Sequence, residues 1–137
     1  SDRTALLMAE MSKVAYYKFE VDANEKVMPQ ANLDIVLKGL ISGVAPAEGT
    51  APPPEGAVKL KEDLAKAGFE LAGLFSNEAT DTQAFLATSI SGGGVQPFGD
   101  EEVAILSFRG TKMAKDWLTN VKFYQKDAKF KATHAGF

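Results

Sequence analysis

The segment best suited to chemistry in this sequence is Phe108-Arg109-Gly110-Thr111, which directly follows an apolar run at residues 103–107. The run has almost no polar face, a pattern typical of a strand covered on both sides in a central, largely parallel sheet. Gly110 lets the backbone turn without a Cβ penalty. Thr111 then brings a hydroxyl and a backbone N–H to the carboxyl end of the strand, the edge at which open α/β sheets bind ligands.

Few other side chains could take part in catalysis. His134 is the single histidine and there is no cysteine, so the sequence predicts neither a disulfide nor a metal site, and we expect no cofactor. The glycines at 92–94 could suggest a phosphate cradle, but no Lys-Ser/Thr follows and no helix opens there, so the P-loop pattern fails. Ser107 lies within the predicted strand, so a Ser107–His134 catalytic pair is not expected.

Three motifs follow one another along the chain: Phe108-Arg109-Gly110-Thr111, Asp116-Trp117 and His134-Ala135-Gly136-Phe137. Their order and spacing resemble the class 3 lipases, an α/β-hydrolase family that includes the fungal triacylglycerol lipases. The resemblance covers roughly the last third of the chain closely, and more loosely a preceding hairpin and an N-terminal helix. It implies an α/β fold that is the amino-terminal part of an α/β-hydrolase, with a mixed sheet, an N-terminal hairpin and flanking helices.

The resemblance also implies roles for single residues. Ester hydrolysis by a serine enzyme places negative charge on the carbonyl oxygen, and N–H donors fixed around that oxygen supply much of the rate. Thr111 matches the position whose backbone N–H is one such oxyanion-hole donor. The alternative is that Thr111 only caps a helix beginning near Met113. The residues expected to support the site structurally are Phe108, Arg109, Gly110 and His134.

Two of these supporting residues carry a more specific expectation. The Arg109 fork should bond carboxylates or carbonyls near the turn. The catalytic order in the family is Ser, Asp, His, whereas His134 would precede the serine. We therefore do not assign His134 as the triad histidine.

Residues 112–121 match the lid of the family. The apolar positions Met113, Trp117 and Val121 fall at i, i+4 and i+8, with Leu118 beside them, so the predicted helix is amphipathic. Such a helix can cover a hydrophobic cleft in water and turn its apolar face outward at a lipid surface. These four residues are therefore expected to form the lid and contact substrate. The alternative is an ordinary surface helix with Trp117 in the core.

Hydrophobic periodicity predicts the elements that position these motifs. We expect helices at 4–17, 33–41 and 58–67, and a hairpin of strands at 69–75 and 82–90. Residues 42–57 hold four of the six prolines and predict a surface loop. A Pro-rich docking ligand is the alternative for this loop. We treat residues 1–137 as one incomplete α/β-hydrolase domain.

Composition narrows the classes of partner. A chain of 137 residues can bury one core, and its net charge of −3 argues against nucleic-acid binding, which normally needs a basic surface. No run approaches the roughly 18 apolar residues of a transmembrane helix, so we expect no transmembrane segment. No secretory signal is visible, and the compartment stays open.

The Gly-x-Ser-x-Gly nucleophile motif of the family does not occur in the sequence. We therefore expect the N-terminal portion of a lipase-like serine hydrolase acting on carboxylic esters, by resemblance lipid acyl esters. It would supply the oxyanion donor and lid, take its nucleophile from the remainder of the parent chain, and be inactive alone. The alternative is a non-catalytic, truncated or degenerate hydrolase module that binds a lipid surface or a partner protein. In either case an open sheet edge is expected to promote self-association.

Overall fold

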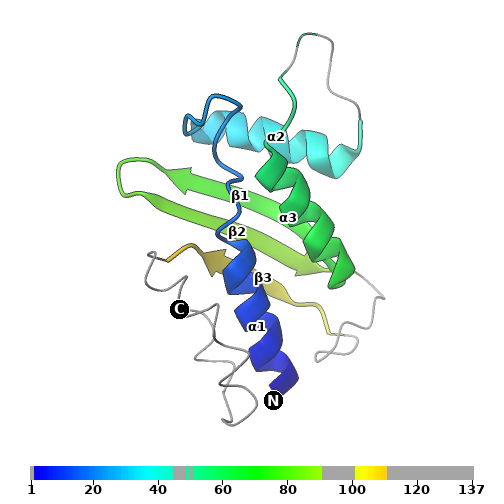
Figure 1. The fold of residues 1–137 in the computed structure, drawn as a ribbon. Helices are drawn as coiled ribbons and strands as arrows, with labels where there is room; N and C mark the ends of the chain where they lie inside the picture. Colours follow the sequence, from blue (N-terminus) through cyan, green and yellow to red (C-terminus); the bar gives the residue numbers. More distant parts are fainter. Residues whose placement is uncertain (1, 45–48, 50, 91–100, 111–137) are drawn as a thin grey trace.

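The computed structural model describes residues 2–44, 49, 51–90 and 101–110 (Figure 1). In chain order its elements are the helices α1 (Asp2–Val14), α2 (Gln30–Ser42) and α3 (Glu55–Lys66), followed by the strands β1 (Phe69–Asn77), β2 (Thr82–Ser89) and β3 (Ala104–Phe108). The three helices and the β1–β2 hairpin predicted from the sequence are confirmed, each element lying within a few residues of its expected bounds.

The three strands form one antiparallel sheet in the order β1-β2-β3. Phe85 at the centre of β2 is flanked by Leu74 of β1 and by Ser107 of β3. A bulge between Leu71 and Gly73 shifts the register of β1. Since β1 and β3 both run antiparallel to β2, their carboxyl ends lie at the same end of the sheet.

All three helices cover the same face of this sheet, which we call the inner face (Figure 1). In α3 the residues Ala57, Leu60 and Leu64 fall at i, i+3 and i+7, and all three are buried. Every second side chain of the strands points toward the helices and packs against these buried helix residues. The larger residues of this core are Met11, Phe19, Leu33, Leu40, Leu60, Leu64, Phe69, Leu71, Leu74, Phe85 and Ile105.

The expectation of a strand covered on both sides in a central parallel sheet is wrong for the described residues. Ile105 and Ser107 of β3 are buried on the inner face, but Leu106 and Phe108 on the outer face are 52% and 50% exposed. Both pairings within the described sheet are antiparallel. An apolar run indicates a strand with apolar side chains on both faces. It does not indicate whether other elements of the fold pack against both faces.

The predicted loop at 42–57 is too long at both ends. Ser42 is the last residue of α2, and residues 55–57 already belong to α3. Proline is compatible with the start of a helix, because the first N–H groups have no intrahelical partner, and here Pro54 precedes the first turn. Gly56 in that turn packs against the chain after α1: a Cβ at this position would lie 2.5 Å from the carbonyl of Lys18.

The free edge of β1 is partly covered by the side chain of Gln30, at the start of α2. The Gln30 Nε2 atom donates to the carbonyl of Leu74 at 2.7 Å, and its Oε1 accepts from the backbone N–H of Ser76 at 3.0 Å. These two groups would otherwise be available to pair with another strand. An open edge is therefore not found along this part of β1, and self-association stays a prediction.

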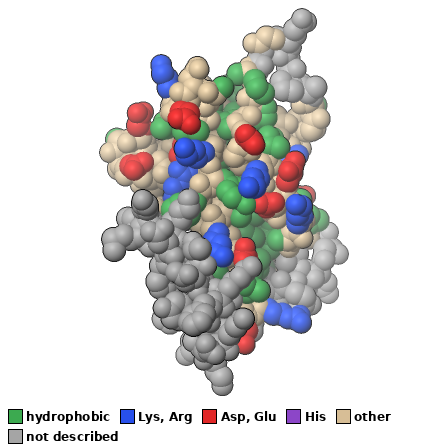
Figure 2. All heavy atoms as spheres, in the orientation of Figure 1, with side chains coloured by type: hydrophobic (Ala, Val, Ile, Leu, Met, Phe, Trp, Pro, Cys, Tyr) green, Lys and Arg blue, Asp and Glu red, His purple; other side chains and the backbone are tan. Residues whose placement is uncertain are grey.

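The helix-bearing side of the molecule carries acidic and basic side chains interspersed, as Figure 2 shows in the orientation of Figure 1. Among the described residues, no helix has both the length and the apolar character that crossing a membrane requires.

Candidate functional site

The structure describes the first three residues of the Phe108-Arg109-Gly110-Thr111 motif, and the fourth lies outside the described residues. Phe108 is the last residue of β3, and Arg109 and Gly110 follow it. Six residues to which the sequence assigns a role lie outside the described residues: Thr111, Met113, Trp117, Leu118, Val121 and His134. The site is therefore built from the strand end and from what surrounds Arg109.

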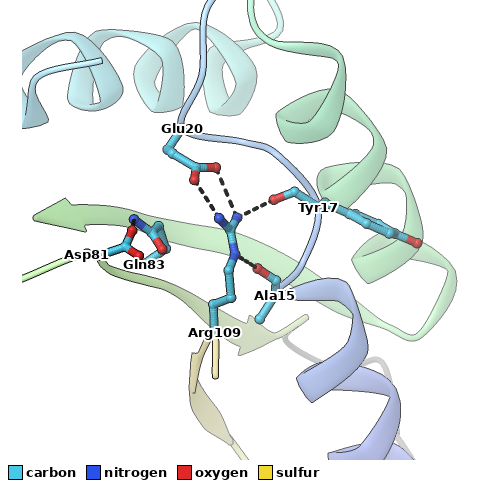
Figure 3. A network of polar contacts seen from close by, with 6 residues as sticks. All are labelled: Ala15, Tyr17, Glu20, Asp81, Gln83 and Arg109. Atoms are coloured by element: carbon cyan, nitrogen blue, oxygen red, sulfur yellow. Dashed lines mark hydrogen bonds and ion pairs between the residues drawn. The ribbon is translucent and has the colours of Figure 1, made fainter. Parts of the chain in front are cut away.

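Arg109 turns its guanidinium toward the inner face, where it meets the chain that leaves α1 (Figure 3). Its Nε donates to the carbonyl of Ala15 at 2.8 Å, and its Nη2 donates to the carbonyl of Tyr17 at 2.6 Å. Both nitrogens of the fork also contact the carboxylate of Glu20, at 2.5 and 3.0 Å. The expected bonding of Arg109 to carboxylates and carbonyls is confirmed by these contacts.

The pair formed by Arg109 and Glu20 is shielded from water. The two side chains are 16% and 6% exposed, and the guanidinium carbon lies 5.1 Å from the ring centroid of the buried Phe19. A bidentate pair fixes the relative orientation of its two planar groups. It therefore connects the end of β3 to the segment that follows α1, although 89 positions of sequence separate the partners.

Glu20 was not identified by sequence reasoning. It follows the aromatic cluster after the first helix, and no spacing relates it to the motif at the end of β3. Its backbone carbonyl accepts from the N–H of Met28 at 2.8 Å, so the residue is held from the main chain as well. Glu20 is 4% exposed in the fold, but nothing in a single sequence distinguishes a buried glutamate from an exposed one.

The backbone of β3 is fixed close to the motif. The N–H of Arg109 donates to the carbonyl of Gln83 at 2.8 Å, which continues the pairing with β2 by one residue beyond Phe108. The hydroxyl of Ser107 donates to the carbonyl of Met11 in α1 at 3.0 Å. Ser107 thus has a structural partner in α1, and the expectation about a Ser107–His134 pair is not tested, because His134 lies outside the described residues.

A groove at the carboxyl ends of β1 and β3 is lined by outer-face residues of the sheet and by Gln30 and Asp34 at the start of α2. Its apolar walls are Phe75, Ala84, Leu106 and Phe108, and its volume is about 630 Å³. Polar side chains that include Asn77 line it as well. Phe108 in this groove lies two residues before Gly110, so an apolar surface adjoins the end of β3.

A second groove lies between the segment after α1 and the start of α3. The hydroxyl of Tyr17 donates to the carboxylate of Asp63 in α3, and the ammonium of Lys59 lies 4.8 Å from the centroid of the Tyr17 ring. Burial, followed by the hydrogen bond and the negative charge of Asp63, raises the pKa of Tyr17 to about 12. This phenol is therefore neutral and serves as a donor at physiological pH.

The described residues contain no cluster of three or more His, Cys, Asp or Glu side chains able to hold a metal ion. Comparison with protein-family models, with curated proteins and with solved structures finds no match to this chain. What the described site can do follows from its geometry: a buried ion pair holds the strand end, and an apolar groove lies beside it.

Proposed function

We propose that this chain is the amino-terminal portion of a lipase-like serine hydrolase acting on carboxylic esters, with lipid acyl esters as the substrate class. In this proposal the backbone N–H of Thr111 is an oxyanion-hole donor and residues 112–121 are the lid. The nucleophile and its Asp and His partners belong to sequence beyond Phe137. The chain alone is inactive, since it has no Gly-x-Ser-x-Gly motif.

The observation that carries the proposal is the ordered set of motifs that begins at Phe108. The fold supports it in two ways: a helix and a hairpin precede the motif, as the resemblance requires, and the Phe-Arg-Gly sequence lies directly at the end of a strand. An apolar groove beside this turn gives a surface compatible with an acyl chain. Catalysis of this kind depends on donors fixed before the charge develops.

The first test compares the 137-residue chain with the longer protein that this proposal requires. Both are assayed on p-nitrophenyl butyrate and p-nitrophenyl palmitate and labelled with a fluorophosphonate probe for reactive serines. We expect labelling and hydrolysis only in the longer protein. Hydrolysis by the 137-residue chain that survives Thr111→Gly and His134→Ala would contradict the assignment.

The oxyanion role of Thr111 is tested in the same longer protein with two variants that differ in one bond. Thr111→Pro removes the backbone N–H, whereas Thr111→Ala keeps it and removes only the hydroxyl. Loss of one oxyanion donor lowers kcat by about 10²–10³. We expect that loss in Thr111→Pro and a loss of about tenfold or less in Thr111→Ala. Equal effects of the two variants would reject the backbone donor.

The lid role can be followed through Trp117, because it is the single tryptophan of the chain. If residues 112–121 turn their apolar face toward lipid, adding phosphatidylcholine micelles should shift the Trp117 emission to shorter wavelength. A Met113→Asp substitution should weaken the shift. An emission spectrum that does not respond to micelles favours the alternative, in which Trp117 is part of the core.

The second candidate is a non-catalytic module that binds a lipid surface or a partner protein. The half-exposed Phe75, Leu106 and Phe108 favour it, since they put apolar surface on one face of the described sheet. Sedimentation with phosphatidylcholine vesicles, with Leu106→Asp as the comparison, measures lipid binding through this face. Lipid binding together with an inactive longer protein would favour the module over the enzyme.

A further inference from the structure

We propose that the groove at the carboxyl ends of β1 and β3, which we call the outer groove, binds a single-chain amphiphile with a quaternary ammonium head. The residues that would form the site are Asp34, Phe75, Ala84, Leu106 and Phe108, and the structure describes all of them. The proposal goes beyond the proposed function, because it concerns binding alone and uses no residue of an ester-hydrolysing centre.

The floor of the outer groove is a row of three side chains that crosses the whole sheet. The register pairs Phe75 of β1 with Ala84 of β2, and Ala84 with Phe108 of β3. A methyl group therefore stands between two phenyl rings, each of which is about half exposed. The volume of about 630 Å³ falls within the range of about 300–1,000 Å³ that is usual for small-molecule sites.

The next row of the sheet extends this apolar surface along the strands. It consists of Gly73, Leu86 and Leu106, which the register also pairs across the three strands. Gly73 has no side chain, and the Phe75 ring lies over it, since a Cβ there would be 2.8 Å from two ring atoms. Two adjacent apolar rows suit an alkyl chain, because the chain can be removed from water without leaving a polar group unpaired.

A carboxylate lies at the β1 side of the outer groove. Asp34 and Gln30, at the start of α2, line the groove beside the sheet residues. The Nε2 atom of Gln30 donates to Asp34 Oδ1 at 2.9 Å and to the carbonyl of Leu74, so the carboxylate is held next to the strand edge. The ion pairs among the described residues involve Asp63 and Glu20, and Asp34 takes part in neither.

These features favour a cationic head over an anionic one. The face of a phenyl ring attracts a cation, and quaternary ammonium groups are recognised by aromatic rings in this way. The Asp34 carboxylate adds a modest attraction, as an exposed charge does. An anionic head would be repelled by Asp34, and the described residues that line the groove include no lysine, arginine or histidine to offset that charge.

The binding experiment titrates the 137-residue chain with dodecyltrimethylammonium below the concentration at which it forms micelles. Calorimetry should give a Kd of about 0.1–1 mM, which is what a ligand of this size reaches. In ¹⁵N-labelled protein the side-chain amide signals of Gln30 and Asn77, which line the groove, should shift. Dodecyl sulfate should bind about tenfold more weakly. Tetramethylammonium, which has no chain, should bind about a hundredfold more weakly.

Three variants test the charge of the site. Asp34→Asn should weaken binding of dodecyltrimethylammonium about three- to fivefold, and Asp34→Lys should reverse the preference in favour of dodecyl sulfate. Glu62→Gln is the matched control, because it removes one negative charge from an exposed side chain of α3 that does not line the groove. It should leave the Kd within about 1.5-fold of wild type, since solvent and salt screen a distant charge.

Phe108→Leu tests the aromatic part of the site, because it keeps an apolar side chain and removes the ring. It should weaken binding of dodecyltrimethylammonium about two- to fivefold, with little effect on the uncharged dodecyl maltoside. Equal losses for both ligands would show that the ring supplies only apolar area and would overturn the choice of a cation.

Three further results would overturn the proposal. The first is equal weakening by Asp34→Asn and Glu62→Gln, which would indicate attraction to the overall negative charge. The second is binding of dodecyl sulfate as tight as that of dodecyltrimethylammonium. The third is binding seen only with micelles or vesicles, which would assign the groove to a lipid surface. None of these measurements needs esterase activity, so they decide the proposal whether or not the proposed function fails.

Discussion

The two faces of the three-stranded sheet differ in how they are covered. On the inner face, Phe85 is fully buried beneath the helices. On the outer face, Phe75 of the neighbouring strand is 43% exposed, and Phe108 is 50% exposed. The same residue type therefore contributes differently on the two sides, because the apolar area removed from water sets the free energy gained.

The comparison shows that the packed core and the apolar groove lie on different faces of the sheet. The inner face holds the core and the ion pair of Glu20 and Arg109, which together fix the strand end. The outer face presents an apolar groove at that same strand end. The proposed function depends on both, since an ester site needs a rigid donor and an apolar surface for the acyl chain.

The largest expected effect tests the contrast between the faces directly. Phe85→Ala should lower the free energy of unfolding by about 3–5 kcal/mol, because it leaves a cavity in a packed core. Phe75→Ala should cost about 1 kcal/mol, since its ring is already half exposed. Urea denaturation followed by circular dichroism measures both. Equal losses would mean that the outer face is covered as well as the inner one.

A second pair of variants tests how closely the helical layer is packed. Gly56→Ala should destabilise the fold by about 1–3 kcal/mol, because its Cβ would collide with the backbone of Lys18. Gly39→Ala in α2 has open space and should stabilise by about 0.5–1 kcal/mol through its higher helix propensity. If thermal denaturation shows that both variants stabilise or both destabilise the fold, the result contradicts the close approach of α3 to Lys18.

A third pair of variants tests whether Gln30 protects the edge of β1, where the two faces of the sheet meet. Gln30→Ala removes both hydrogen bonds to the strand edge and should cost about 1–2 kcal/mol. It should also increase self-association in sedimentation velocity, because two backbone groups become available for pairing. Asp34→Ala removes an exposed partner of Gln30 and should change stability by less than about 0.5 kcal/mol. An unchanged sedimentation profile of Gln30→Ala would argue against edge pairing.

The smallest expected effect concerns Tyr17 at the rim of the helical layer. Its pKa is raised from 10.0 to about 12 in the folded chain, so the unfolded chain releases this proton first as the pH rises. The stability that the raised pKa contributes is complete below pH 10 and is lost by about pH 12. The difference in urea midpoint between wild type and Tyr17→Phe should therefore shrink across this interval. A difference independent of pH would show that Tyr17 titrates normally.

Sequence reasoning located the elements well where the signal is local. The spacing of Leu60 and Leu64 in α3 and the apolar residues on both faces of the second hairpin strand report burial that a single segment can encode. It failed at β3, where an apolar run was taken to mean cover on both sides. Leu106 and Phe108 are residue types common in a core strand. Whether they are buried depends on elements from other parts of the chain, which the sequence of the strand does not encode.

The candidate site shows the same division. The sequence alone determined that an arginine and a glycine follow directly after a strand, and that an arginine there would need acceptors for its fork. Only the tertiary structure decided that Glu20 and two carbonyls after α1 are those acceptors, and that the Gln30 amide covers the edge of β1. The physical reason is range: helix and strand patterns arise from neighbours a few residues apart, whereas these contacts join segments 44 and 89 positions apart, which only packing of the whole core brings together.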